Sequence, residues 1–259
     1  MNEQDAKSVV VGINGSSAAV SAAKWAIEEA RSRQLPLRLV YVIPRREAQP
    51  VSAPVSEWEI ERGETALSRA ECAVQGAKKP VEVETAIVSG DPGQALINES
   101  QDAALVCVGT SRRGWASDGL LGPTAAALVA GAQCPVAIIR TNPDGSPTEP
   151  GVIAVVLNDE PDNDEVVHQA MEQGRRRHAV VRQIDRRLKS WVRRYPDVPV
   201  QIVAAGTGVK TGEKREKDGA AIELAVVGSA DAAEMAALTT PNCHPIVGYP
   251  DCSVLVVRP

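Results

Sequence analysis

Short apolar runs rich in β-branched residues alternate with helix-like patterns along the first half of the chain. Apolar residues recur at helical spacing from Ala19 to Ala30 and again from Ile60 to Val74. Asp91-Pro92 has the residue types of a helix N-cap and first helical position, which predicts a third helix. The strand-sized runs are Ser8–Ile13, Leu37–Ile43, Val81–Val88, Ala104–Gly109 and Val136–Arg140. Strands that alternate with helices predict βαβ units and an α/β fold around a mainly parallel sheet.

The second half of the chain repeats the first. Val106–Gly109 matches Ala225–Gly228, and Cys134–Arg140 matches Cys252–Arg258, at offsets that agree to within one residue. We therefore predict two tandem domains, each an open, mainly parallel five-stranded sheet with flanking helices. Their predicted bounds are residues 1–141 and 151–259, joined over residues 142–150 by a segment with the composition of a linker.

The repeat is shorter at its beginning than the first copy. Between Ile153 and Pro199 the second copy lacks roughly 25 of the residues that separate Val9 from Pro80. We interpret the missing piece as a strand plus a long loop. Within the residues that remain in this interval, Val181, Ile184, Leu188, Trp191 and Tyr195 fall on one face of a helical wheel, which predicts an amphipathic helix there.

Composition excludes several classes of protein. A net charge of −5 and a pI near 5.4 argue against general nucleic-acid binding. Five cysteines without a CxxC pair make a poor disulfide framework and favour a reducing compartment. The polar start of the chain lacks an apolar signal segment, and no apolar stretch is long enough to cross a membrane. We expect a cytoplasmic protein without a membrane partner.

A glycine-spaced loop is the strongest indication of a binding site. The run Val106–Gly109 leads into residues 109–124, and a helix is predicted to open at the end of that loop. Backbone N–H groups at a helix N-terminus form an anion site, so the pattern is typical of phosphate binding. Two residues depart from it, because Arg112 is bulky and Pro123 has no N–H to donate.

Four motifs in a fixed order resemble the universal stress protein family in its tandem two-domain form. They are Val10–Ser16, Gly90-Asp91-Pro92, the Gly109–Thr124 loop and Cys134-Pro135-Val136. The resemblance is strong over residues 1–140 and looser over 151–259. It implies an open α/β fold, and it implies ATP as ligand in members whose loop is intact, since only some members bind it.

The resemblance also implies which residues form the site. It places Asn14 and Gly15 after the first strand, and it places the edge that contacts adenine near Val42. The loop contributes Gly109, Arg112, Gly122, Pro123 and Thr124. Asn14 stands where ATP-binding members have Asp, so it can hydrogen-bond a ribose or base but brings no charge to a metal ion. Arg112 either fills the phosphate space or replaces a contact, and Thr124 offers a hydroxyl beside Pro123.

Three functional hypotheses follow. The preferred one is a non-catalytic stress-response protein that acts by binding, with a weak or lost nucleotide site in the first domain. The alternative is an ATP sensor in which occupancy of the Gly109–Gly122 loop controls a protein partner. The third is a slow nucleotide hydrolase, which lacks an evident general base. We expect no catalytic residue, no metal site and no cofactor besides ATP.

The second domain is expected to be a structural partner. Asp231 and Glu234 follow its Gly228, and their carboxylates would repel phosphate. We expect the missing residues to include its adenine edge. We also expect the domains to pair through their fifth strands, Val136–Arg140 and Ser253–Arg258, and the chain to form a homodimer.

Other motifs carry weaker indications. The basic stretch Arg175–Arg194 fits either an anion patch or a solvated helix face balanced by nearby acids, and we favour the second. Gly206–Lys214 lacks the complete P-loop pattern and is predicted to be a loop. Ser111 has no histidine placed to serve it, and Cys243-His244 alone does not make a metal site.

Overall fold

The computed structural model describes residues 7–45, 55–111, 121–142, 151–157, 163–185, 197–204, 222–229 and 252–258. The chain divides into two compact units. The first comprises Met1–Arg113 and Leu121–Pro147, and the second comprises Gly114–Leu120 and Thr148–Pro259. Among the described residues, no helix combines the length and the apolar character that crossing a bilayer requires.

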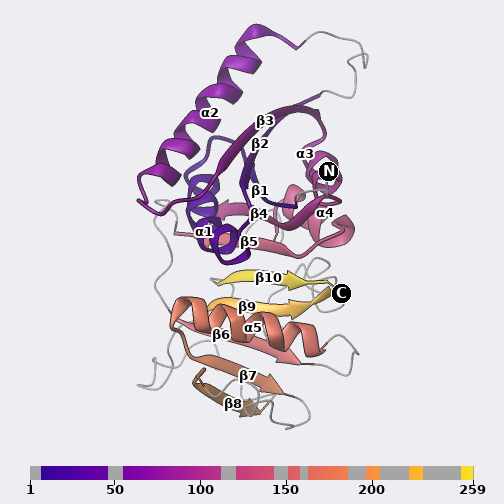
Figure 1. Cartoon of the computed structure of the whole chain (residues 1–259). Coiled ribbons are helices and arrows are strands. Elements are labelled where there is room, and N and C mark those ends of the chain that lie inside the picture. Colours follow the sequence, from indigo (N-terminus) through magenta and orange to yellow (C-terminus); the bar gives the residue numbers. More distant parts are fainter. Residues whose placement is uncertain are drawn as a thin grey trace, which may run out of the picture. The chain divides into compact units, whose positions relative to one another are not determined.

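The first unit is a five-stranded parallel sheet with the strand order β3-β2-β1-β4-β5 (Figure 1). Its strands are β1 (Ser8–Ile13), β2 (Leu37–Pro44), β3 (Val83–Gly90), β4 (Ala103–Ser111) and β5 (Val136–Thr141). Its helices are α1 (Ser17–Arg33), α2 (Glu57–Gln75), α3 (Pro92–Glu99) and α4 (Pro123–Gly131). Helices α1 and α2 pack together on one face of the sheet, and α3 and α4 pack together on the other.

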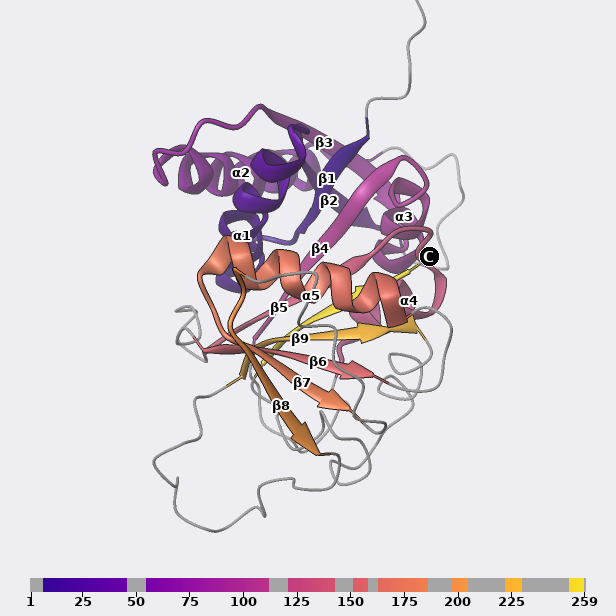
Figure 2. The same ribbon diagram turned by 60° about the horizontal axis from the view of Figure 1, so that its bottom comes forward.

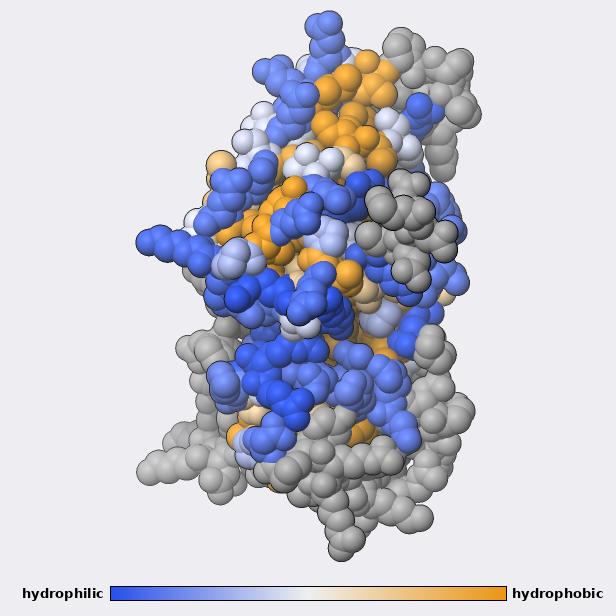
Figure 3. All heavy atoms as spheres, viewed as in Figure 1, coloured by the Kyte–Doolittle hydropathy of each residue, from blue (hydrophilic) through white to orange (hydrophobic). Residues whose placement is uncertain are grey.

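Small side chains let α1 approach the sheet closely. Its buried face is mostly alanine, including Ala18, Ala19, Ala22 and Ala26, each at most 2% exposed. Opposite it, the central strands bury β-branched and leucine side chains, as expected for parallel strands covered on both faces. Helix α2 buries a narrower stripe and leaves a hydrophilic outer face, which Figure 3 shows beside apolar surface in this part of the first unit.

The second unit repeats the first topology. Its strands β6 (Val152–Leu157), β7 (Val181–Asp185), β8 (Val200–Ala204), β9 (Ile222–Gly228) and β10 (Ser253–Val257) are parallel, in the order β10-β9-β6-β7-β8. Helix α5 (Asn163–Arg177) follows β6 as α1 follows β1. Figure 2 shows the fan of β6, β7 and β8. The predicted α/β class, with a mainly parallel sheet and flanking helices, is confirmed.

The prediction of an amphipathic helix from Val181 was wrong. Residues Val181–Asp185 form β7, which pairs with β6 and β8. The second copy therefore keeps its second strand, and our interpretation that this strand was lost was also wrong. The connection that is shorter in the second copy is the one between β7 and β8, which comprises residues 186–199. The corresponding connection of the first unit, between β2 and β3, comprises residues 45–82 and includes all of α2.

Candidate functional site

The strand order places a crevice at the carboxyl end of the first sheet. From β1 the chain continues to β2 on one side, whereas β4 lies on the other side of β1. In open α/β sheets, ligands bind where the connections diverge in this way. A cavity of about 470 Å³ opens at this place, a size typical of small-ligand pockets. It is lined by Gly12, Ile13, Asn14, Val40, Tyr41, Val42, Pro44, Arg62, Pro92, Leu96, Val108, Gly109, Thr110, Gly122, Pro123, Thr124 and Ala125.

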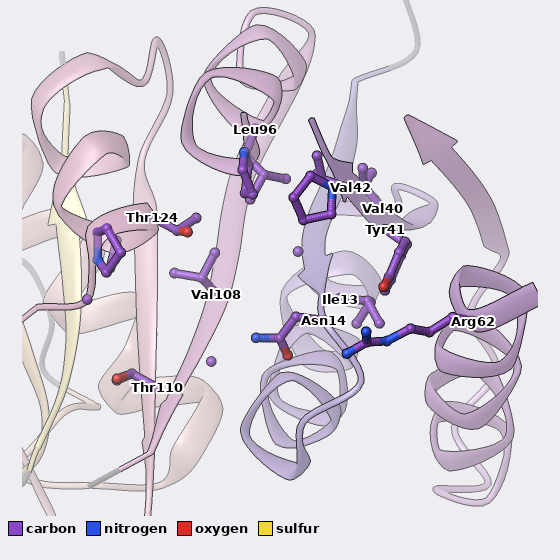
Figure 4. A pocket seen from close by; sticks show the side chains of 17 residues that line it. Ile13, Asn14, Val40, Tyr41, Val42, Arg62, Leu96, Val108, Thr110 and Thr124 are labelled. Atoms are coloured by element: carbon purple, nitrogen blue, oxygen red, sulfur yellow. The ribbon is translucent and has the colours of Figure 1, made fainter. Parts of the chain in front are cut away.

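One end of the cavity is the N-terminus of α4. Gly122 is the N-cap residue and Pro123 is the first helical residue, and no side chain in the described part of the chain caps the helix. No hydrogen bond from the N–H of Thr124 or Ala125 is present within the described residues, and both residues line the cavity. The Thr124 hydroxyl stands beside them (Figure 4). Free N–H groups and the positive end of the helix dipole favour an anion here.

Gly109 and Gly122, the two glycines of the loop, differ in whether packing requires a glycine. A Cβ at Gly109 would lie 2.1 Å from the Ala18 carbonyl oxygen, so the approach of α1 to β4 requires glycine whatever the ligand. A Cβ at Gly122 would lie more than 4 Å from every heavy atom of the described residues. Gly122 has an ordinary extended backbone (φ −66°, ψ 165°). Packing against the described residues therefore does not require glycine at this position, and the absence of a side chain leaves space at the N-terminus of α4.

Asn14 stands at the middle of the cavity. Its Oδ1 accepts a hydrogen bond from the Ser16 N–H at 3.0 Å, and Ser16 in turn caps α1 by accepting from the Ala19 N–H. This leaves the Nδ2 group of Asn14 to face the cavity, where Figure 4 shows it directed toward the β4 side. A primary amide offers two N–H donors. Asn14 therefore presents donors, and no charge, at this point.

The other end of the cavity is apolar. Val40, Val42 and Pro44 of β2 form one wall, and Pro92 and Leu96 of α3 form another. Helix α3 is positioned by Asp91, whose side chain caps it by accepting from the Gln94 N–H at 2.9 Å. The cavity thus has an anion end at α4 and an apolar end between β2 and α3.

Arg62 is a cavity residue that the sequence patterns did not identify. It extends from α2 toward Asn14 (Figure 4). Helix α2 comes close to β2 here because Gly63 has no side chain: a Cβ at that position would lie 2.9 Å from Tyr41 Cδ1. Arg62 directly precedes the buried stripe of α2. Gly63, the small residue next to it, was the only indication in the sequence that α2 approaches β2 closely.

The structure brings most of the expected site residues together. Asn14, Val42, Gly109, Gly122, Pro123 and Thr124 all line the one cavity. Gly15 lines an adjoining hollow that shares Asn14, Tyr41 and Arg62 with the cavity. Arg112 lies outside the described residues. The loop differs from expectation at its start, because β4 runs through Gly109 to Ser111.

Two of the three arginines that end α5, Arg175 and Arg177, are paired with acids. Arg175 donates to both Asp197 and Glu172, and Arg177 pairs with Glu223 at 3.3 Å. Figure 3 shows hydrophilic surface where α5 lies. For this part of the stretch, the balanced surface helix is the better interpretation. In the described segments no three His, Cys, Asp or Glu side chains cluster as a metal site would require.

Comparison with known proteins identifies a family. The sequence model of the universal stress protein family matches residues 6–140. Universal stress protein Rv2624c of Mycobacterium tuberculosis (strain H37Rv) is 36% identical over a 273-residue alignment that covers 99% of this chain and 98% of the relative. Universal stress protein Rv3134c of the same strain is 35% identical, with 92% and 94% covered.

The fold has a solved counterpart of the same length. A universal stress protein from Archaeoglobus fulgidus superimposes with a TM-score of 0.66, covering 99% of both chains at 12% identity. At this identity the likeness concerns the fold.

Proposed function

The chain belongs to the universal stress protein family, and from this premise we propose that its first unit binds an adenine nucleotide reversibly, as a regulatory ligand that it does not convert. The nucleotide occupies the cavity at the carboxyl end of the sheet. Its phosphate lies at the N-terminus of α4, and its base lies in the apolar end between β2 and α3. The ribose lies between them, beside Gly109 and Asn14.

The observation that carries the proposal is the open N-terminus of α4. Gly122 leaves space that no described protein atom occupies, and the free N–H groups of Thr124 and Ala125 border that space. A protein that used this region only for packing would gain from a side chain at the N-cap, where Ser, Thr, Asp and Asn stabilise helices. Glycine there suits the close approach of a ligand phosphate.

The lining of the cavity supports binding without catalysis. Among its described residues there is no Asp, Glu, His, Lys or Cys to act as general base, nucleophile or metal ligand. Pro123 lacks one N–H of the cradle, and a lost hydrogen bond to a charged group costs about 1.5–3 kcal/mol. The affinity is therefore about 10- to 100-fold lower than that of the same cradle with all its N–H groups.

Two variants at one position test where the phosphate lies. Gly122→Asp and Gly122→Asn add side chains of nearly the same size, and both types stabilise helix N-termini. Only the aspartate places a negative charge beside the phosphate. We expect calorimetric titration with AMP or ATP to show binding at least about 100-fold weaker for Gly122→Asp than for Gly122→Asn. Thermal unfolding should show neither variant to be less stable than wild type.

The controls distinguish the hypotheses. Ala130→Val adds bulk to an exposed residue of α4 outside the cavity and should leave binding unchanged. Equal affinities of the aspartate and asparagine variants would place the phosphate elsewhere. No binding by wild type at millimolar nucleotide, with or without magnesium, would overturn the proposal. Turnover above the rate in buffer would favour the hydrolase hypothesis.

A further inference from the structure

A second hollow adjoins the nucleotide cavity, between α2 and the turn that joins β1 to α1. Its volume is about 520 Å³. It shares Asn14, Tyr41 and Arg62 with the cavity, so the two spaces meet at these side chains. The remaining lining residues are Gly15, Trp58, Glu61, Thr65, Ala66 and Arg69. We call this hollow the α2 groove.

One stripe of α2 forms the outer wall of the groove. Trp58, Arg62, Thr65 and Arg69 follow one another at intervals of four, three and four residues, which places them on one face of the helix. The stripe extends over about 16 Å, from the rise of about 1.5 Å per residue. It runs beside the buried stripe of α2 and holds an exposed aromatic ring with two guanidinium groups.

Small residues form the floor of the groove. Gly15 has a left-handed backbone (φ 81°), and a Cβ there would lie 3.7 Å from the Ala66 side chain. The turn and the helix are therefore close together where their side chains are absent or small. Larger residues at these two positions would fill the groove, so its depth depends on them.

The groups along the groove suit an aromatic anion. Trp58 is 61% exposed, although large apolar side chains are otherwise mostly buried in the described segments. Neither Arg62 nor Arg69 forms an ion pair with any other described residue, and Glu61 is the one carboxylate in the lining. Arg62 and Asn14 together give a donor-rich corner where the groove meets the cavity. Arginine binds phosphate with two parallel hydrogen bonds, and nucleobases stack on exposed aromatic rings.

We propose that the α2 groove is a second nucleotide subsite, so that the ligand of this protein is a dinucleotide whose second nucleotide is joined to the ribose 3′-oxygen of the first. Arg62 binds the linking phosphate, and Trp58 stacks on the second base. The inference rests on the proposed function, because it takes the position of the first nucleotide from the cavity.

The orientation proposed for the first nucleotide is the reason for placing the linkage at its 3′-oxygen. With the base at the apolar end and the 5′-phosphate at α4, the ribose lies beside Asn14, and its 2′,3′ edge is free to face the corner formed by Asn14 and Arg62. An anion at this corner meets donors and no carboxylate among the residues that the two spaces share. The groove then continues along α2 toward Trp58, where a second base has room.

Calorimetry with four adenine ligands tests the inference. The ligands are AMP, adenosine 3′,5′-bisphosphate, the dinucleotide pApA and the trinucleotide pApApA. We expect wild type to bind pApA at least about tenfold more tightly than AMP, with the bisphosphate between them. The trinucleotide should bind no more tightly than pApA. If it binds at least about tenfold more tightly, the groove is a path for single-stranded RNA and the dinucleotide proposal is wrong.

Variants on α2 assign the contacts. Trp58→Ala should lower pApA affinity about tenfold and leave AMP affinity unchanged, whereas Arg62→Gln should remove the preference for the bisphosphate over AMP. Ile60→Ala, which truncates an apolar side chain 39% exposed on the same helix outside the groove, is the matched control and should change neither affinity. Circular dichroism of each variant checks the fold.

The outcomes distinguish the two proposals. AMP binding without tighter pApA binding overturns the groove inference and leaves the proposed function standing. Failure of all four ligands overturns both. A pApA preference that survives Trp58→Ala and Arg62→Gln also overturns the inference, because the second nucleotide then lies outside the groove.

Discussion

Gly109 and Gly122 are separated by one loop, yet they constrain the protein in opposite ways. At Gly109 the backbone of α1 occupies the space a side chain would need, with the Ala18 carbonyl oxygen 2.1 Å from the position of a Cβ. At Gly122 no heavy atom of the described residues lies within 4 Å of that position. A spaced-glycine pattern thus combines one residue needed for folding with one that is free to serve a ligand.

This contrast predicts unequal effects of the same substitution on stability. Gly109→Ala should lower the free energy of unfolding by about 3 kcal/mol, because α1 must move away from β4 to admit the methyl group. Gly122→Ala should cost less than about 1 kcal/mol, since the methyl group meets open space and alanine is only a poorer N-cap. Urea unfolding monitored by circular dichroism gives both values. Similar losses for the two variants would contradict the packing explanation.

The residues that line the cavity differ in how far the sequence indicated them. Asn14, Val42, Gly109 and Gly122 line it and were expected to lie together from the resemblance to the family. Arg62 was not, since its role depends on how closely α2 approaches β2, and that distance is set by Gly63 against the Tyr41 ring. A local pattern records which face of a helix is buried, but not which side chain at the border of that face reaches a neighbouring cavity.

At the scale of elements, β-branched runs located most strands well. β1 has the predicted bounds, whereas β3 begins two residues later than predicted. β7 was not predicted because its residue types do not show the alternation of buried and exposed side chains. Val181 and Gln183 are both buried, but glutamine is a polar residue and so does not indicate a buried position. Pairing with β6 and β8 outweighed the helical spacing of the apolar residues.

Helix α5 is tied to the segment before β8 by a pH-sensitive contact. Arg175 donates two hydrogen bonds to Asp197, at 2.7 and 3.1 Å. These side-chain hydrogen bonds hold the pKa of the Asp197 carboxyl below its ordinary value of 3.8. A carboxyl whose pKa is lowered by folding stabilises the folded state above its ordinary pKa, and this contribution is lost as the pH falls through the lowered value.

We therefore expect Arg175→Gln to raise the pKa of Asp197 toward its ordinary value, as measured by NMR titration of the carboxyl carbon. The small stability difference between this variant and wild type should be present at neutral pH and vanish in strong acid. Glu172→Gln is the matched control, because it removes the other carboxylate that Arg175 contacts and leaves the bonds to Asp197 in place. A depressed pKa that persists in Arg175→Gln would show another cause.

At the scale of the whole molecule, the repeat in the sequence predicted that the second sheet copies the first, and the strand orders of the two units match. The position of the shortened segment was not predictable from offsets alone. An offset records how many residues are missing between two matched motifs, but the missing piece can fall on either side of an unrecognised strand. Because β7 was not recognised, the missing piece was wrongly interpreted as including a strand.

Ligand protection should be confined to the first unit. In hydrogen exchange followed by mass spectrometry, saturating AMP should slow exchange at the N-terminus of α4 and at the turn after β1. Peptides from α5 and β6 should be unchanged. At 100 times the dissociation constant, the nucleotide adds about 2.7 kcal/mol to the stability of the state that binds it.

Adenosine is the matched ligand for this experiment. Without a phosphate, it should protect the turn after β1 and leave the N-terminus of α4 exchanging as in the free protein. Protection of α5 or β6 by AMP would place a nucleotide in the second unit and contradict the assignment.

The short connection between β7 and β8 has a consequence for the proposed ligand binding. Residues 186–199 are fewer than the 19 of α2, so the second unit has no room for a helix of that length at the corresponding place. The wall that carries Trp58, Arg62 and Arg69 is therefore not expected in the second unit. Under the proposed function, a single chain holds one site of this kind and no second one with which to cooperate. We then expect nucleotide binding within a chain to follow a simple hyperbola, so that occupancy rises gradually with ligand concentration.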